Sequence, residues 1–333
     1  MKKGTIWFIA TILVVLVVSF GIGCKETAAA EDEELIIGFA WDYVDNIARI
    51  AEEDLARRAA EEAGARVIFT SADTDSTRQH TNIEDLISRG VDAILAIPVD
   101  SKAIAAGIKL AQDAGIPFVT IDRTTSPEAD YHPDGFASTD STKQAYSAGI
   151  ALADVLEEDG VTAKTFVLIG DLRDENAINR DNGFRQAAEE RGMEIIADFP
   201  TEWNPERALT GTTDALMGYP DINTIFLPSD FLLPAVQSAL DGAGKWAIRG
   251  EPNHIYIASQ DVFPSGYRAV RDGYIDSNTA WDIQLFAEQG IDMCIKLAMG
   301  ETLDDPIRLV EGRTITLENV SEIEGLWGQL YSE

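Results

Sequence analysis

Short apolar runs alternate with longer amphipathic stretches along this chain. The runs are as long as strands, and the stretches between them repeat apolar residues three or four positions apart, as a helix with one buried face does. In the first part of the chain, strands and helices are predicted in alternation over residues 35–40, 47–63, 66–70, 82–89, 91–97, 102–114 and 118–121. Such alternation is typical of a parallel sheet whose strands are connected by helices.

Turn residues support these boundaries. Gly64, Gly90 and Gly115 each follow a predicted helix, where a left-handed backbone at the helix end favours glycine. Asp100 and Ser101 precede the next helix and can cap it. The first part of the chain therefore predicts a continuous parallel sheet.

After a turn-rich segment over residues 124–135 the alternation resumes. A helix is predicted near 142–156, and strands are predicted at 165–169, 194–196, 224–227 and 255–258. A chain of 333 residues with 45% apolar residues is too long for one typical domain. We therefore predict an α/β protein with two lobes.

The N-terminal segment has the form of a targeting signal. Residues 1–23 contain no acid, begin with Lys2 and Lys3, and continue as an apolar run over residues 6–20. This is the form and length of a signal peptide, and it is short for a membrane span. An uncleaved anchor is the alternative.

Cys24 follows small residues just after the apolar run, and it resembles the lipid-accepting cysteine of bacterial lipoproteins. Gly21 stands where those proteins usually have a branched apolar residue, so cleavage near Ala30 is an alternative. Residues 24–34 are rich in alanine and acids and are interpreted as a flexible tether. The expected location is the periplasm or the outer face of the cell envelope, with the protein anchored to the membrane by lipid at Cys24.

Charge and motifs exclude several functions. A formal net charge of −31 argues against nucleic acid as a partner. Neither a glycine-rich phosphate loop nor a G-x-S-x-G nucleophile motif occurs, and no histidine lies at metal-ligand spacing from another histidine or a cysteine. Cys294 lies in a helical pattern and is interpreted as a core residue. We therefore predict no enzyme activity, no cofactor and no metal.

Asp122 and Arg123 directly follow a predicted strand, at the sheet edge where open α/β folds hold ligands. The guanidinium offers a rigid fork of donors and the carboxylate offers acceptors, so the pair can bracket neighbouring hydroxyl groups. A salt bridge at the strand end is the alternative.

Tryptophans add a second signal. Trp41, Trp203 and Trp281 each occur beside polar residues at predicted strand ends or loops. An indole face packs well on the C–H face of a sugar ring. The alternative for each of them is core packing.

Seven motifs in this order resemble the type I periplasmic sugar-binding proteins, the ribose- and xylose-binding family. The motifs are Ile37-Gly-Phe-Ala-Trp-Asp42, Ser88-Arg-Gly-Val-Asp-Ala93, Ile97-Pro98, Asp122-Arg123, Asp174-Glu-Asn-Ala177, Trp203-Asn-Pro-Glu-Arg-Ala-Leu209 and Ser259-Gln-Asp261. The resemblance implies two Rossmann-like lobes joined by three hinge strands. In this family the two lobes close on one monosaccharide, here expected to be D-xylose or a related aldopentose. The loaded monomer is expected to dock on the permease of an ABC transporter. The implied boundaries are 34–136 with 282–311 for the N-terminal lobe and 137–281 with 312–333 for the C-terminal lobe.

The resemblance also implies a set of ligand contacts. Asp122 and Arg123 match a first-lobe clamp for hydroxyls, Trp203 matches a ring-stacking aromatic, and Trp281 occupies a hinge position where relatives place Gln or Lys. The expected ligand-binding residues are Asp42, Asn46, Arg49, Asp122, Arg123, Asp174, Asn176, Arg180, Trp203, Ser229, Asp261 and Trp281.

Some alternatives stay open at this point. The first loop departs from the family at Ile47, Ala48 and Arg49. With Arg49, Arg123 and Arg180 near the site, an acidic sugar or a different polyol is conceivable as the ligand. An input component of a chemotaxis or quorum-signalling receptor has the same sequence features.

Overall fold

A computed structural model of the chain describes Met1, residues 34–45 and residues 47–330. The predicted signal peptide, most of the tether, Cys24 and Asn46 lie outside the described residues. From Glu34 onward the chain forms one compact unit that contains both lobes.

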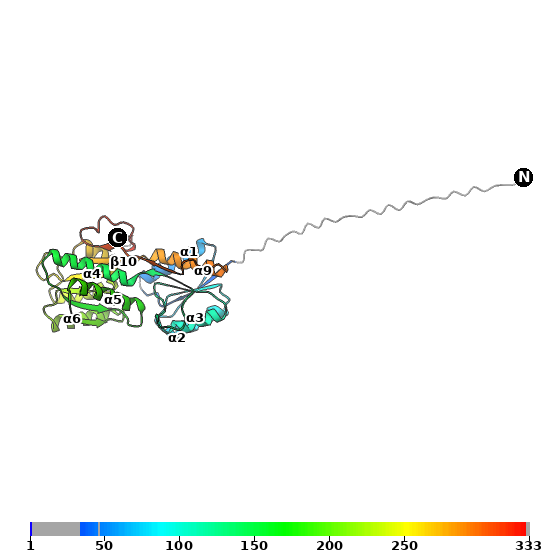
Figure 1. The fold of residues 1–333 in the computed structure, drawn as a ribbon, viewed down its shortest axis with the longest axis horizontal. Coiled ribbons are helices and arrows are strands. Elements are labelled where there is room, and N and C mark those ends of the chain that lie inside the picture. Colours follow the sequence, from blue (N-terminus) through cyan, green and yellow to red (C-terminus); the bar gives the residue numbers. More distant parts are fainter. Residues whose placement is uncertain (2–33, 46, 331–333) are drawn as a thin grey trace. The chain divides into compact units, whose positions relative to one another are not determined.

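The first lobe contains a six-stranded parallel sheet with the strand order β11-β5-β4-β3-β1-β2. Its strands are β1 (Ile36–Trp41), β2 (Arg66–Ser71), β3 (Ala93–Ala96), β4 (Phe118–Ile121), β5 (Gly135–Thr139) and β11 (Ile307–Val310). Helices α1 (Ile47–Glu62) and α9 (Ile283–Ala298) pack on each other over one face, and α2 (Ser76–Ser88) and α3 (Ile104–Asp113) cover the other (Figure 1).

The second lobe has a sheet with the order β12-β10-β9-β8-β6-β7, parallel except for β12. Its strands are β6 (Lys164–Ile169), β7 (Glu194–Pro200), β8 (Thr224–Phe226), β9 (Tyr256–Asp261), β10 (Ser277–Ala280) and β12 (Thr314–Ile315). Its helices are α4 (Ser141–Glu158), α5 (Glu175–Arg191), α6 (Pro205–Gly218), α7 (Leu233–Gly242), α8 (Pro264–Arg271) and α10 (Trp327–Leu330), with a single turn of 3-10 helix at Asp230–Leu232.

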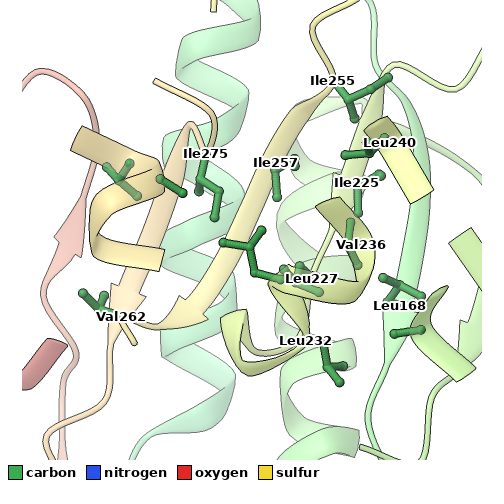
Figure 2. Close-up of a cluster of buried hydrophobic side chains, with 14 of the residues drawn as sticks. Leu168, Ile225, Leu227, Leu232, Val236, Leu240, Ile255, Ile257, Val262 and Ile275 are labelled. Atoms are coloured by element: carbon green, nitrogen blue, oxygen red, sulfur yellow. The ribbon is translucent and has the colours of Figure 1, made fainter. Parts of the chain in front are cut away.

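Aliphatic side chains fill the space between this sheet and α6, α7 and α8. Figure 2 shows members of the cluster pointing toward one another from strands and helices, among them Leu168, Ile225, Leu227, Val236, Leu240 and Ile257. All six are fully buried, with 0% exposure. Burial of such side chains stabilises a fold by about 1.5–3 kcal/mol each relative to exposure, so the lobe is a rigid support for the loops at its strand ends.

The chain crosses between the lobes three times, as the resemblance implies. The crossings lie between β5 and α4, between β10 and α9, and between β11 and β12. Two of them touch, because a Cβ atom at Gly312 would lie 2.2 Å from the carbonyl oxygen of Ala280. The fold is thus two α/β lobes on a three-stranded hinge.

Two expectations need correction. Strand β5 belongs to the first sheet up to Thr139, so the first crossing lies beyond the predicted lobe boundary at residue 136. Helix α2 begins at Ser76 and not at residue 82, because Asp75 caps it by accepting hydrogen bonds from the backbone N–H groups of Thr77 and Arg78. The other lobe boundaries remain predictions.

Candidate functional site

The strand ends of both sheets converge on one cavity. Its empty volume, including the open space at its mouth, is about 460 Å³. The lining residues are Tyr43, Ala48, Arg49, Asp122, Arg123, Asp174, Asn176, Arg180, Trp203, Ser229, Phe231, Asp261, Phe263 and Trp281. Ten of the twelve residues expected to bind ligand are therefore brought together around one space.

The parallel topology places these residues. Asp122 and Arg123 follow β4, Asp261 ends β9, and Trp281 follows β10. Asp174 caps the N-terminus of α5 by accepting a hydrogen bond from the backbone N–H of Asn176 at 2.9 Å. Ligands of open α/β sheets bind at such carboxyl ends.

Backbone strain marks two of the carboxylates. Asp122 has φ 60° and Asp261 has φ 89°, in a region that residues with a side chain seldom adopt. Such conformations persist where the surrounding structure imposes them, and they cluster at functional sites. Here they aim two acids from different sheets at the same cavity.

A charged network forms the first-lobe wall. Arg49 is buried and forms ion pairs with Asp122 at 2.7 Å, with Asp42 at 3.1 Å and with Glu52 at 2.6 Å. Burial alone would lower the pKa of Arg49, but the three carboxylates raise this pKa well above its ordinary value. Arg49 is therefore a fixed cation.

Asp42 lies behind this wall. It does not line the cavity, and its Oδ2 accepts a hydrogen bond from Arg123 Nη1 at 2.6 Å. Burial raises the pKa of Asp42, although Arg49 and Arg123 oppose the shift. The structure thus places Asp42 as a support for both arginines, whereas the sequence predicted a ligand contact.

Glu52 is a member of the network that sequence reasoning missed. It lies on α1 with no exposed surface, and burial raises the pKa of Glu52 to about 8. Its Oε2 accepts a hydrogen bond from Arg49 at 2.6 Å. Its position three residues after Arg49 was the available signal, since residues at this helical spacing are neighbours.

The second-lobe wall holds a separate charged pair. Arg180 donates hydrogen bonds to both oxygens of Asp261, at 2.6 and 3.0 Å, and to the carbonyl of Pro228 at 2.8 Å. Such two-point pairing fixes both side chains. The remaining lone pairs of the carboxylate still face the cavity region and can accept from hydroxyl groups.

Trp203 is held in place by three neighbours. Its indole Nε1 donates to Asp174 at 2.9 Å, and the guanidinium of Arg180 lies 6.0 Å from its ring centroid. Its ring rests on Gly170, where a Cβ atom would lie 2.2 Å from the indole. Glycine at residue 170 is therefore required for this position of the ring.

Other aromatic residues differ from the expectation. Trp41 has no exposed surface and stacks on Phe39 with ring centroids 4.7 Å apart, so it is a core residue. Tyr43, Phe231 and Phe263 also line the cavity, although they were not among the expected residues. Each is within two residues of an expected site residue, and that proximity was the only available signal.

The two lobes touch directly across the site. Arg123 Nε lies 2.8 Å from Asp174 Oδ2, and Asn176 Nδ2 donates to Asp122 Oδ1 at 3.0 Å. Beside the cavity, Ser101 Oγ accepts a hydrogen bond from the backbone N–H of Glu175 at 3.1 Å. First-lobe and second-lobe residues therefore enclose one space together.

The structure also bears on metal-binding clusters, on membrane-spanning helices and on the location of Cys294. In residues 34–45 and 47–330, no group of three or more His, Cys, Asp or Glu side chains is arranged to hold a metal ion. Within the same part of the chain, no helix is both long and apolar enough to cross a membrane. Cys294 is buried in the first-lobe core, as predicted.

Comparison with known proteins decides the family. A profile of the periplasmic binding protein domain matches residues 37–302. The chain belongs to this family. The matched residues include every residue that lines the cavity and the first two of the three crossings.

Curated relatives share modest sequence identity with this family member. The ribose import binding protein of Bacillus subtilis is 25% identical over 86% of this chain and 90% of its own length. The D-xylose-binding periplasmic protein of Escherichia coli is 24% identical over 88% and 89%, respectively. These similar identities favour neither sugar.

Solved structures of the family share the fold. An ABC transporter solute-binding protein of Mycobacterium smegmatis with bound glycerol superposes with a TM-score of 0.78 at 23% identity, covering 88% of this chain and 97% of that one. One from Bacillus halodurans with bound myo-inositol has a TM-score of 0.76 at 23% identity, covering 87% and 96%. The two-lobed architecture is therefore that of solute-binding proteins.

Proposed function

We propose that this protein binds one neutral monosaccharide or cyclic polyol outside the cytoplasm and delivers it to an ABC importer. The observation that carries the proposal is the enclosure of one cavity by charged pairs from both lobes, Asp122 with Arg123 and Arg180 with Asp261. Family membership and the names of the ribose- and xylose-binding relatives support it. D-xylose or a related aldopentose remains our prediction for the ligand.

The charge balance of the site favours a neutral ligand over an acidic sugar. Each of the three arginines already pairs with at least one carboxylate: Arg49 with Asp42, Asp122 and Glu52, Arg123 with Asp42 and Asp174, and Arg180 with Asp261. Carboxyl groups thus outnumber guanidinium groups. A carboxylate on the ligand would add repulsion without a new partner.

Closure supplies the mechanism of capture. Side chains from both lobes satisfy the ligand hydroxyls, and the ligand shifts the population toward the closed form because that form binds it better. The predicted signal peptide would direct export, and a tether attached through lipid at Cys24 would then hold the protein at the outer face of the membrane beside its permease.

A thermal-shift screen of the mature protein across pentoses, hexoses, cyclic polyols and uronic acids tests this proposal. A ligand that binds only the native state raises the melting temperature, and the stabilisation grows with the logarithm of the ratio of its concentration to its Kd. We expect neutral sugars or polyols to raise it and uronic acids to leave it unchanged. Stabilisation by uronic acids alone would contradict the proposal.

A further inference from the structure

An aromatic wall closes one part of the cavity. We use this term for Phe231, Phe263 and Trp281, all of which line the cavity. The ring centroids of Phe231 and Phe263 are 6.0 Å apart. Trp327 lies between Phe263 and Trp281. Its ring centroid is 4.7 Å from that of Phe263 and 6.5 Å from that of Trp281. The three rings of the wall therefore pack into one aromatic cluster with Trp327, which lies behind them.

The wall lacks acceptors for a hydroxyl proton. Phe231 and Phe263 carry no polar side-chain atom. The indole Nε1 of Trp281 is a donor only, and it is buried without an acceptor among the described residues. Behind the wall, the Nε1 of Trp327 already donates to the carbonyl of Asp261 at 2.9 Å.

A cation beside the wall shares this property. The guanidinium of Arg49 lies 5.8 Å from the ring of Trp281, and a guanidinium also only donates. A ring or ether oxygen can accept from such donors. A hydroxyl placed against the wall would lose the water that accepted its proton, and this loss disfavours binding.

We infer that the site selects neutral sugars that turn an edge without a hydroxyl toward the aromatic wall, such as the ring CH₂ of a pentopyranose or the methyl group of a 6-deoxyhexose. The inference rests on the proposed function and narrows its substrate class. Apolar pockets reject an added hydroxyl by about 10- to 100-fold, so a similar preference is expected here.

Matched sugars separate polarity from size. D-xylose, 6-deoxy-D-glucose and D-glucose share one ring stereochemistry, as do L-arabinose, D-fucose and D-galactose. In each series the 6-deoxy sugar has nearly the size of the hexose but lacks its terminal hydroxyl. Calorimetric titration should show the 6-deoxy sugar of the better-bound series binding about ten-fold or more tightly than the hexose.

Equal affinities for the hexose and its 6-deoxy form, or tighter binding of the hexose, would overturn the inference while leaving the proposed function standing. If no sugar of either series binds, and none in the wider screen does, the proposed function fails as well. The wild-type ratio tests the preference itself, and a variant tests its assignment to the wall.

A substitution assigns the preference to the wall. Trp281→Gln offers an amide that both donates and accepts, so the ratio of the two affinities should fall toward one. Trp246→Gln is the matched control, because Trp246 stacks on Tyr274 with centroids 4.6 Å apart and does not line the cavity. An unchanged ratio in a folded Trp281→Gln protein, judged by its melting transition, would also overturn the inference.

Discussion

At the scale of single residues, the site is built from acids and arginines that fix one another before any ligand arrives. Arg49 contacts three carboxylates, and Arg180 grips Asp261 at two points. Fixed donors and acceptors need not reorganise when a ligand binds, and this lowers the cost of association. Loss of one member should therefore be felt strongly in affinity.

Asp122→Ala and Asp261→Ala should each weaken sugar binding by an order of magnitude or more. A hydrogen bond to a charged group contributes about 1.5–3 kcal/mol, and each substitution also leaves an arginine with a lost partner. Isothermal titration calorimetry measures the effect. The control is Asp113→Ala, which removes an exposed ion-pair partner of Lys109 on α3 and should leave sugar affinity unchanged. Wild-type sugar affinity in both the Asp122→Ala and the Asp261→Ala protein would refute the site assignment.

Glu52→Gln should stabilise the protein increasingly as the pH rises from about 5 to 8. Because burial raises the pKa of Glu52 from 4.5 to about 8, the native state keeps a proton that the unfolded chain releases in this range. Stability from this group is present below about pH 4.5 and is lost as the pH rises through the folded pKa. Denaturant unfolding of the wild-type and Glu52→Gln proteins between about pH 5 and pH 8 measures the difference in their free energies of unfolding. A difference that does not vary with pH would contradict the prediction.

Sequence reasoning found Asp122 and Arg123 because they directly follow an apolar strand, where the topology fixes their location, and it took the other acids and arginines from the resemblance to the family. It missed Phe231 and Phe263, since aromatic residues outside long helices and strands carry no periodicity that separates a cavity wall from a core. It also assigned Asp42 to the ligand, because two arginines that are distant in sequence were not seen to converge on that carboxylate.

At the scale of elements, the turn between β6 and α5 links the backbone to the site. Gly170 leaves room for the indole of Trp203, and Asp174 caps α5 while accepting from that indole. The repeating βα pattern predicted β6 at residues 165–169, whereas α5 was not predicted. The predicted start of α2, residue 82, lies C-terminal to the observed start at Ser76. Residues 76–81 are polar, so only the cap at Asp75 marks the start of this helix in the sequence.

Gly170→Ala should weaken sugar binding by about ten-fold. The added Cβ would lie 2.2 Å from the indole, so Trp203 must shift. The shift weakens the hydrogen bond from its indole to the Asp174 carboxylate. Hydrogen bonds to charged groups contribute about 1.5–3 kcal/mol each. Calorimetry gives the affinity and the quenching of tryptophan fluorescence reports the ring. Gly242→Ala is the control because nothing lies within 4 Å of its Cβ position. Equal affinities of the two variants would count against this account of Trp203.

At the scale of the whole molecule, the three crossings and the contacts between lobes describe a hinged clamp. Ser101 forms a contact between the lobes, since its Oγ accepts from the backbone N–H of Glu175 and its backbone N–H donates to the carbonyl of Arg173 at 3.1 Å. The alternating pattern and the chain length predicted the two lobes, and the resemblance to the family implied the hinge. It did not predict this contact, which joins loops from different sheets.

Ser101→Ala should reduce sugar affinity by about two- to ten-fold while leaving the melting temperature of the ligand-free protein almost unchanged. The lost neutral hydrogen bond is worth about 0.5–1.5 kcal/mol and exists only when the lobes meet. Ser238→Ala, whose hydroxyl bonds within α7, should change neither quantity. A Ser101→Ala protein with full affinity would show that the contact does not stabilise the closed form.

The most direct test of the central claim is a crystal structure of the mature protein with its best-binding sugar. The sugar should lie in the cavity between the lobes, contacted by Asp122 or Arg123 on one side and by Arg180 or Asp261 on the other, with Trp203 against its ring. A sugar bound elsewhere, or held by side chains of a single lobe, would contradict the account.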